Sequence, residues 1–92
     1  MQTGYVIVLD VLLEGAVPSV FDGDGKPCIF TTQIEAEREI ADNAITRLQE
    51  FMDGERDFED AITVEEYVVA VNILPDGTLV FAGENHVIPR NL

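Results

Sequence analysis

The chain has 92 residues, 47% of them hydrophobic, and this length allows one domain, 1–92, with a modest core. Eighteen acidic residues face five basic ones, so the formal net charge is −13 at pH 7. A small soluble domain needs a net charge of only about 2–8 for solubility. The excess disfavours anionic membranes and direct contact with nucleic acid, and it favours a basic protein surface as the partner.

The cysteine content and the N-terminus indicate the compartment. The single cysteine, Cys28, cannot form an internal disulfide, which favours a reducing environment. Beside Phe30 in a predicted strand, Cys28 is more typical of a small buried apolar residue than of a reactive thiol. The apolar run 5–13 has no basic segment before it and is too short to span a bilayer. We therefore predict a soluble, cytoplasmic protein with no membrane contact.

The first part of the chain is predicted to form strands. Residues 4–13 are β-branched and leucine-rich, as is typical of a central strand. Gly15 and Pro18 interrupt the run. Residues 20–21 and 27–30 then flank a glycine-rich turn and are predicted to form a second, shorter hairpin.

The turn sequence Asp22-Gly23-Asp24-Gly25-Lys26 invites comparison with two kinds of active site. An EF-hand would place Lys26 at the fifth ligand position and Pro27 where glycine is needed. A phosphatase of the haloacid-dehalogenase type would require a far larger parallel-sheet domain. Asp-Gly pairs supply the positive φ angles of a tight hairpin, so Asp22 and Asp24 are predicted to turn the chain.

A helix of about twenty residues is predicted to follow. Thr32 and Glu35 form a capping box that places the N-cap at Thr32, and Gly54 is a suitable C′ residue. The apolar residues recur at three- and four-residue steps, which predicts an amphipathic helix packed on the sheet. They are Ile34, Ala41, Ile45, Leu48 and Met52, with Ile40, Ala44 and Phe51 beside them.

The C-terminal third is predicted to return to the sheet. After an acidic, irregular segment with Phe58 and Ile62 as anchors, residues 65–74 form a second long strand and residues 78–81 a short one. Pro75-Asp76-Gly77 is the predicted turn between them. The order β-β-β-α-β-β predicts an α+β fold, an antiparallel four- to five-stranded sheet with one long amphipathic helix on one face.

Both long strands are apolar on both of their faces, although one helix can cover only one face of a sheet. Loop segments, a second copy of the chain or a partner could cover the other face. A homodimer or a partner contact is the favoured prediction. The residues assigned to this possible oligomer face are Val6, Val8, Leu12, Val68, Ala70 and Leu74.

Catalytic chemistry has little support in the sequence. His86 is the one histidine and lies in a polar tail, and neither Ser19 nor Cys28 is spaced from it as a nucleophile would be. The sequence has no glycine-rich phosphate loop, no His-x-x-x-His pair and no cysteine cluster. We therefore predict a non-enzymatic protein with no catalytic residues, no metal site and no cofactor.

The acidic residues are concentrated between Glu35 and Glu66, where twelve of them and three arginines give −9 of the total charge. A solvated helix face would explain this, and so would a protein contact that imitates nucleic-acid phosphates. Arg38, Arg47 and Arg56 could form internal ion pairs or contact the partner. The predicted protein-binding residues are Glu35, Glu39, Asp42, Glu50, Asp53, Glu55, Asp57, Glu59 and Asp60.

The acid-rich run IEAEREIADNAITRLQEFMDGERDFEDAITVEEY, with the chain size and the sheet-plus-helix design, resembles small acidic inhibitors encoded by phages and mobile elements. These include DNA mimics and anti-CRISPR proteins. The resemblance implies a protein in the host-cell cytoplasm that occupies the basic groove of a Cas effector or another nucleic-acid-binding complex. The alternative hypothesis is a small homodimeric accessory module whose charge serves only solubility.

Overall fold

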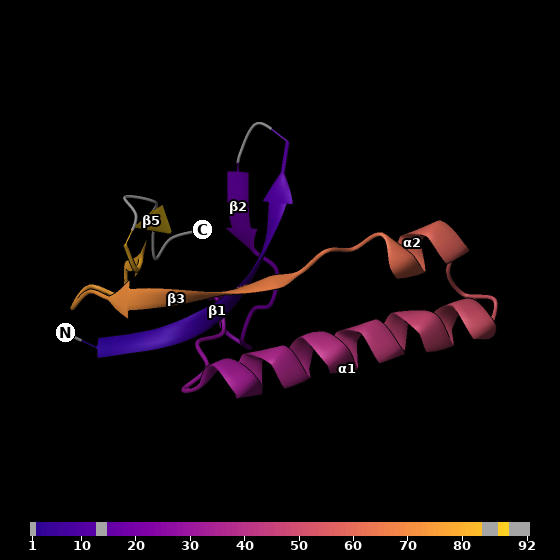
Figure 1. Ribbon diagram of the computed structural model, residues 1–92, viewed down its shortest axis with the longest axis horizontal. Coiled ribbons are helices and arrows are strands. Elements are labelled where there is room, and N and C mark those ends of the chain that lie inside the picture. Colours follow the sequence, from indigo (N-terminus) through magenta and orange to yellow (C-terminus); the bar gives the residue numbers. More distant parts are fainter. Residues whose placement is uncertain (1, 13–14, 84–86, 89–92) are drawn as a thin grey trace.

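The structure is a computed structural model that describes residues 2–12, 15–83 and 87–88. Five strands form one antiparallel sheet in the order β2-β1-β3-β4-β5 (Figure 1). They are β1 (Gln2–Val11), β2 (Gly15–Pro18), β3 (Tyr67–Ile73), β4 (Leu79–Phe81) and β5 (Val87–Ile88). Two helices, α1 (Gln33–Met52) and α2 (Phe58–Ile62), lie between β2 and β3. The predicted α+β class, with an antiparallel sheet and one main helix, is confirmed.

The predicted order of elements is wrong in detail, because two strands precede α1 and α2 follows it. β2 lies where we expected Gly15 and Pro18 only to interrupt the first strand. A strand can include Pro18 there because β2 is at the edge of the sheet, where a proline is tolerated. The predicted strand 27–30 is reduced to isolated bridges, one of which joins Phe30 to Tyr5 by backbone hydrogen bonds of 2.7 and 2.9 Å. The expected turn at residues 75–77 is present, with Gly77 at φ +91°.

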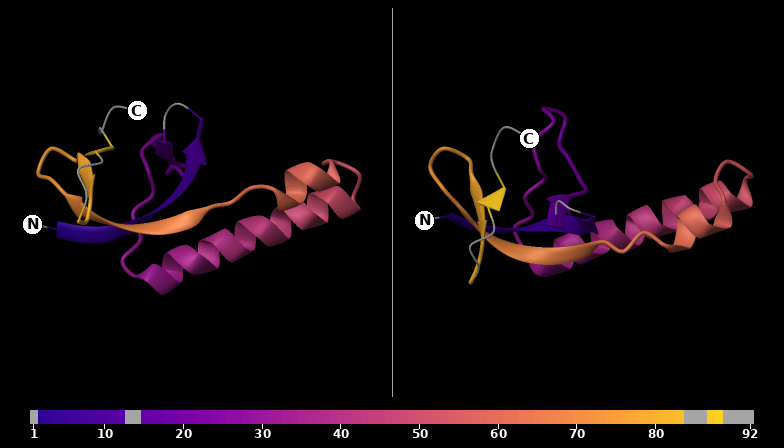
Figure 2. Two further views of the ribbon diagram at one scale, coloured as in Figure 1. Left: turned by 45° about the horizontal axis from the view of Figure 1, so that its top comes forward. Right: turned by 90° about the horizontal axis from the view of Figure 1, so that it is seen from above.

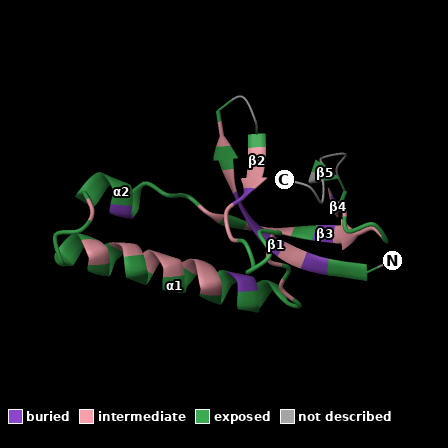
Figure 3. Ribbon diagram, turned by 180° about the vertical axis from the view of Figure 1, so that it is seen from behind, coloured by how far each residue is buried: buried purple, intermediate pink, exposed green. Residues whose placement is uncertain are grey.

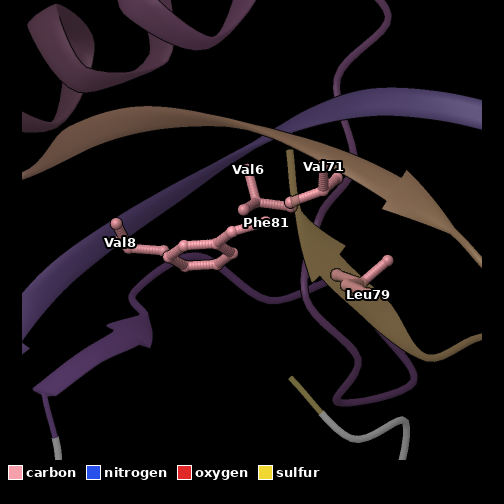
Figure 4. Packing of buried hydrophobic residues seen from close by; sticks show 5 residues of the cluster. All are labelled: Val6, Val8, Val71, Leu79 and Phe81. Atoms are coloured by element: carbon pink, nitrogen blue, oxygen red, sulfur yellow. The ribbon is translucent and has the colours of Figure 1, made fainter. Parts of the chain in front are cut away.

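The core lies on one face of the sheet and is closed by the sheet itself. Val6 and Val8 of β1 pack with Val71, Leu79 and Phe81, and all five are almost inaccessible to solvent (Figure 4). β2 and the β4–β5 strands rise on one side of β1 and β3, while α1 runs along the other side (Figures 1 and 2). One side of β1 and β3 is therefore covered by the curl of the chain's own sheet, and the other side contacts α1.

The residues predicted as an oligomer face do not share one face. These residues are Val6, Val8, Leu12, Val68, Ala70 and Leu74. Val68 pairs with Ile7 across the β1–β3 ladder, and directly opposite residues project to the same side, so Val68 lies on the α1 side, opposite Val6 and Val8. Val6 and Val8 are core residues, whereas Leu12, just after β1, is 88% exposed. The six residues therefore do not form one continuous face of the sheet.

Both predicted ends of α1 are confirmed. The Thr32 hydroxyl accepts a hydrogen bond from the Glu35 backbone N–H at 3.3 Å, as an N-cap residue does. At the other end Gly54 adopts φ +79°, and the N–H groups of Gly54 and Glu55 donate to carbonyls of the last helical turns at 3.0 and 2.8 Å. These two bonds form a Schellman motif, which stops the helix at the glycine.

The orientation of α1 differs from the prediction. Ala36 is the fully buried residue of this helix, and Ile40 and Ala44 are half-buried beside it (Figure 3). The apolar stripe that we expected to pack on the sheet points to solvent instead. Its members are Ile34, Ala41, Ile45, Leu48 and Met52, all of them exposed. The helix is held in this orientation by an ion pair and by α2, both described below.

The molecule is elongated because α1 extends past the sheet. A helix of 20 residues is about 30 Å long, whereas the sheet strands under it have at most 10 residues and a strong twist. The radius of gyration is 14.2 Å, against about 12 Å for a compact chain of this length. The second half of α1 and the whole of α2 form the projecting end of a molecule measuring 45 × 28 × 25 Å (Figure 2).

Candidate functional site

The predicted acidic residues on α1 fall along one side of the helix. At about 100° per residue, Glu35, Glu39, Asp42 and Glu50 lie within a sector of about 80°. Glu35 and Asp42 are exposed, and Glu39 and Glu50 lie at the inner border of the sector, where they are half-buried. The outer part of this sector is therefore the part of α1 that can present carboxylates to another molecule.

Arg47 forms an internal ion pair that ties α1 to the sheet. Its guanidinium lies 3.2 Å from the Glu66 carboxylate, just before β3, and the side chains of Arg47 and Glu66 are 14% and 5% exposed. The Ser19 hydroxyl donates to the second oxygen of Glu66 at 2.8 Å. Three segments that are distant in the sequence thus meet at one carboxylate. The structure answers the open question for Arg47, which is a structural residue.

Arg56 forms a second internal ion pair at the projecting end. Its guanidinium is 2.9 Å from the Glu50 carboxylate, and each side chain is about one-third exposed. The pair joins the last turns of α1 to the link before α2. Arg38 forms no ion pair with any described residue. Of the twelve carboxylates between residues 35 and 66, Glu50 and Glu66 are paired in this way, which leaves ten.

The densest group of these ten lies at the projecting end, and we call it the acidic tip: Asp53, Glu55, Asp57, Glu59 and Asp60. All five residues are exposed. The Schellman turn reverses the chain after α1, and α2 then packs back on α1 through the buried Ala61. Phe51 and Phe58 meet edge to face at 5.2 Å between ring centroids and hold the two helices together.

Some of the carboxylates of the acidic tip can stabilise α2. Asp57 is at the N-cap position of α2, although its side chain makes no capping hydrogen bond, and Glu59 and Asp60 lie in the first turn, where the helix dipole favours negative charge. Such a contribution is about 0.3–1 kcal/mol for each exposed group. Asp53 and Glu55 gain nothing from α2 in this way. The stability of α2 therefore explains some carboxylates of the acidic tip but not their number.

The charge density can be compared with that of DNA. α1 carries five carboxylates over about 30 Å, or one in about 6 Å, whereas duplex DNA has one charge per about 1.7 Å of axis. The acidic tip places five carboxylates within the eight residues 53–60. Acidic residues are therefore more frequent along the chain at the tip than in α1. The nine predicted residues do not form one uniform surface.

The sequence reasoning missed the exposed apolar stripe of α1. Ile45 and Met52 are 64% and 75% exposed, although aliphatic side chains at these spacings usually mark the buried side of a helix. Phe58 and Ile62 of α2, predicted as core anchors, are each 52% exposed. The side of α1 that faces the rest of the protein carries the polar residues Asn43 and Arg47, both half-buried, and this polar pair was the feature of the sequence that could have indicated the correct orientation.

The Asp22–Lys26 loop is a turn, as predicted. The Asp22 carboxylate accepts the backbone N–H groups of Asp24 and Lys26 at 2.8 and 3.1 Å, and Gly25 has φ +78°. A hollow of about 170 Å³ separates this loop from the turn after β3, below the range of about 300–1,000 Å³ typical of small-molecule sites. The carboxylate of Asp76 on its other side accepts the Thr78 backbone N–H.

Cys28 behaves as a structural residue in this environment. Partial burial, with smaller contributions from the carboxylates of Asp22 and Glu39, raises the pKa of its thiol. A raised pKa keeps the thiol protonated at neutral pH and lowers its nucleophilicity. The prediction of an unreactive cysteine is consistent with this direction. His86, the other residue considered for catalysis, lies outside the described residues.

Comparisons with known proteins give no relative. No protein-family model matches the chain, and neither the curated proteins nor the solved structures contain a match to it. Among the described residues, no helix combines the length and the apolar character needed to cross a membrane.

Proposed function

We propose that this chain is a non-enzymatic binding protein that inhibits a nucleic-acid-handling complex by occupying its basic surface. Cas effector complexes are the class of target that the resemblance to anti-CRISPR proteins suggests. The observation that carries the proposal is the acidic tip: five exposed carboxylates, none of them in an ion pair with a described residue, at the end of the molecule that projects furthest.

The internal arrangement of charge supports this proposal. Arg56 lies within the tip segment, yet its guanidinium is paired with Glu50 of α1 and does not neutralise any of the five tip carboxylates. Arg47 is likewise engaged by Glu66. The negative field at the projecting end is therefore left uncompensated, and it would steer a basic surface toward the tip and increase the association rate at low salt.

The magnitude of the electrostatic term limits what the tip can do alone. An exposed ion pair contributes about 0.2–1 kcal/mol, so five of them contribute about 1–5 kcal/mol. This corresponds to roughly a fivefold to several-thousandfold change in affinity. Charge on the tip can therefore select and orient a basic partner, but a tight complex needs apolar burial as well. The tip is proposed as the recognition element of a larger contact.

The experiment is a competition between this protein and DNA. Purified Cas effector complexes of several types, each loaded with guide and fluorescent target DNA, are titrated with the protein while the anisotropy of the DNA is measured. We expect the DNA to be displaced from at least one complex at 50 mM salt. The displacement should weaken strongly at 300 mM salt, because screening shortens the range of the tip charges.

A tip variant and a charge-matched control decide where the inhibition originates. The tip variant is Glu55→Gln, Asp57→Asn, Glu59→Gln and Asp60→Asn. The control, which changes the net charge equally but far from the tip, is Asp24→Asn, Gln2→Lys, Thr3→Lys and Thr31→Lys. We expect the tip variant to inhibit at least tenfold less well than the control. Equal inhibition by the two, or no displacement from any complex, would overturn the proposal.

A further inference from the structure

The exposed side of α1 has the spacing of a coiled-coil seam. Starting at Ile34, the positions advance by alternating steps of four and three residues, which is the strict repeat by which one helix packs along another. We call this set the α1 seam: Ile34, Arg38, Ala41, Ile45, Leu48 and Met52. All six residues are exposed, and the set covers about 27 Å of helix.

The seam is separate from the side of α1 that this protein uses for its own fold. At about 100° per residue, the seam is centred about 140° away from the side that carries Ala36, Ile40 and Arg47. That inner side contacts the sheet and α2. A helix with apolar residues at five of the six seam positions on its free side can pack against a second helix without any rearrangement of the fold.

The positions that flank the seam indicate the charge of this second helix. In the coiled-coil repeat, Glu35, Asp42 and Gln49 occupy one flank. Glu37 begins the other flank, which continues with Ala44 and Phe51. Three carboxylates and no cation therefore border the first half of the seam. Flanking positions set partner choice through ion pairs, so the complementary helix carries lysine or arginine at its own flanks.

The same flanks argue against a second copy of this chain. Two copies packed in parallel along the seam would bring Glu35, Glu37 and Asp42 of one next to the acidic flanks of the other. Each copy also carries a net charge of −13, which adds repulsion over a longer range. A basic helix relieves both effects.

Arg38 gives the seam a register. It is the charged member of the seam and forms no ion pair with a described residue. A single polar residue at a core position of a coiled coil favours the alignment that supplies its partner. The occupant is therefore expected to place an acidic side chain opposite Arg38, between apolar residues that meet Ile34 and Ala41.

We propose that the α1 seam is the docking site for a basic amphipathic helix of about 18–20 residues on the partner protein, packed in coiled-coil fashion. This inference rests on the proposed function, because it names the partner element that the acidic α1–α2 surface would recognise. The seam supplies the apolar burial, the flanking carboxylates select basic helices, and Arg38 selects the register.

The test uses the full chain and a synthetic probe. The probe is a fluorescein-labelled peptide of 21 residues with isoleucine and leucine at the core positions, lysine at the flanks and one glutamate placed to face Arg38. A scrambled peptide of the same composition keeps the charge and loses the pattern. At 150 mM salt we expect anisotropy to give at least tenfold tighter binding of the patterned peptide than of the scrambled one.

Matched variants locate the binding. The seam variant is Ile45→Lys with Met52→Lys, and the control is Leu12→Lys with Phe21→Lys, which adds the same charge at other exposed apolar positions. Circular dichroism verifies that both are folded. We expect the seam variant to bind the patterned peptide at least tenfold more weakly, with the control unchanged. Equal binding of the two variants, or of the two peptides, would overturn the proposed seam.

Two further outcomes separate this inference from the proposed function. If the seam variant still displaces DNA from an effector complex while the tip variant does not, the seam fails and the inhibitor proposal stands. If the peptide binds the seam but no effector complex loses DNA, the inhibitor proposal fails and the seam stands. A dimer in sedimentation equilibrium that the seam variant splits would assign the seam to a second copy and overturn the basic-helix proposal.

Discussion

The Arg47–Glu66 pair offers a quantitative test of the fold, because it is the contact that orients α1. The Glu66 side chain is 5% exposed and accepts hydrogen bonds from both Arg47 and Ser19. Replacing Glu66 by alanine leaves the Arg47 guanidinium largely buried with no carboxylate beside it. Removing one partner of a buried ion pair typically costs about 3–5 kcal/mol, mainly from the uncompensated charge.

That loss is large for a domain of this size. A chain of 92 residues is expected to have a free energy of unfolding of about 5–14 kcal/mol. With a urea m-value near 1.5 kcal/mol per M, a loss of about 3–5 kcal/mol lowers the midpoint of urea unfolding by about 2–3 M. The assay is urea unfolding of wild type and Glu66→Ala, followed by circular dichroism.

A double variant separates the buried charge from the loss of packing. Arg47→Met combined with Glu66→Leu removes both charges and keeps most of the volume, so its stability should lie within about 1 kcal/mol of wild type. If Glu66→Ala lowers the free energy of unfolding by less than about 1 kcal/mol, the pair does not hold α1 in place. A double variant as unstable as the single one would instead show that the loss does not come from the uncompensated charge of Arg47.

Three more changes test other parts of the structure. Phe81→Ala should lower the free energy of unfolding in urea by about 3–5 kcal/mol, because the Phe81 ring is buried in the core. Leu12 is 88% exposed, so Leu12→Ala should change this free energy by less than about 0.5 kcal/mol. Similar losses for the two variants would contradict the described core. Cys28 should react with iodoacetamide more slowly than glutathione at pH 8, because its raised pKa leaves less thiolate, and a rate equal to that of glutathione would refute this. Gly54→Ala should lower stability by about 1 kcal/mol, since φ +79° disfavours a side chain, and no change in the thermal midpoint would show that the Schellman turn is unimportant.

The elements of this fold were predictable where local chemistry decides them. The capping box at Thr32 and the glycine at Gly54 act within a few residues, so the bounds of α1 followed from the sequence. The Asp22 turn is similarly local. β2 and α2 were missed because four and five residues carry too little periodic signal, and their formation depends on pairing with β1 and packing on α1.

The two errors of orientation have one cause, which is that tertiary contacts decide between faces. The register that pairs Ile7 with Val68 is set by the whole β1–β3 ladder, and a shift of one residue reverses every side chain. The buried side of α1 is chosen by Glu66, which lies 19 residues beyond Arg47 in the chain. Apolar character alone would predict that Ile45 is buried. The sequence showed that residues 53–60 are rich in acidic side chains, but their position at one end of the molecule depends on the packing of α2 on α1.

We propose that the projecting end of the molecule, formed by α1 and α2, contacts the partner. The most direct measurement is hydrogen–deuterium exchange of this protein, free and bound to an effector complex from which it displaces DNA. We expect slower exchange of residues 33–62 on binding, with β2 and the turn 75–77 unchanged. Slower exchange confined to β2 or to the turn 75–77, with residues 33–62 unaffected, would contradict it.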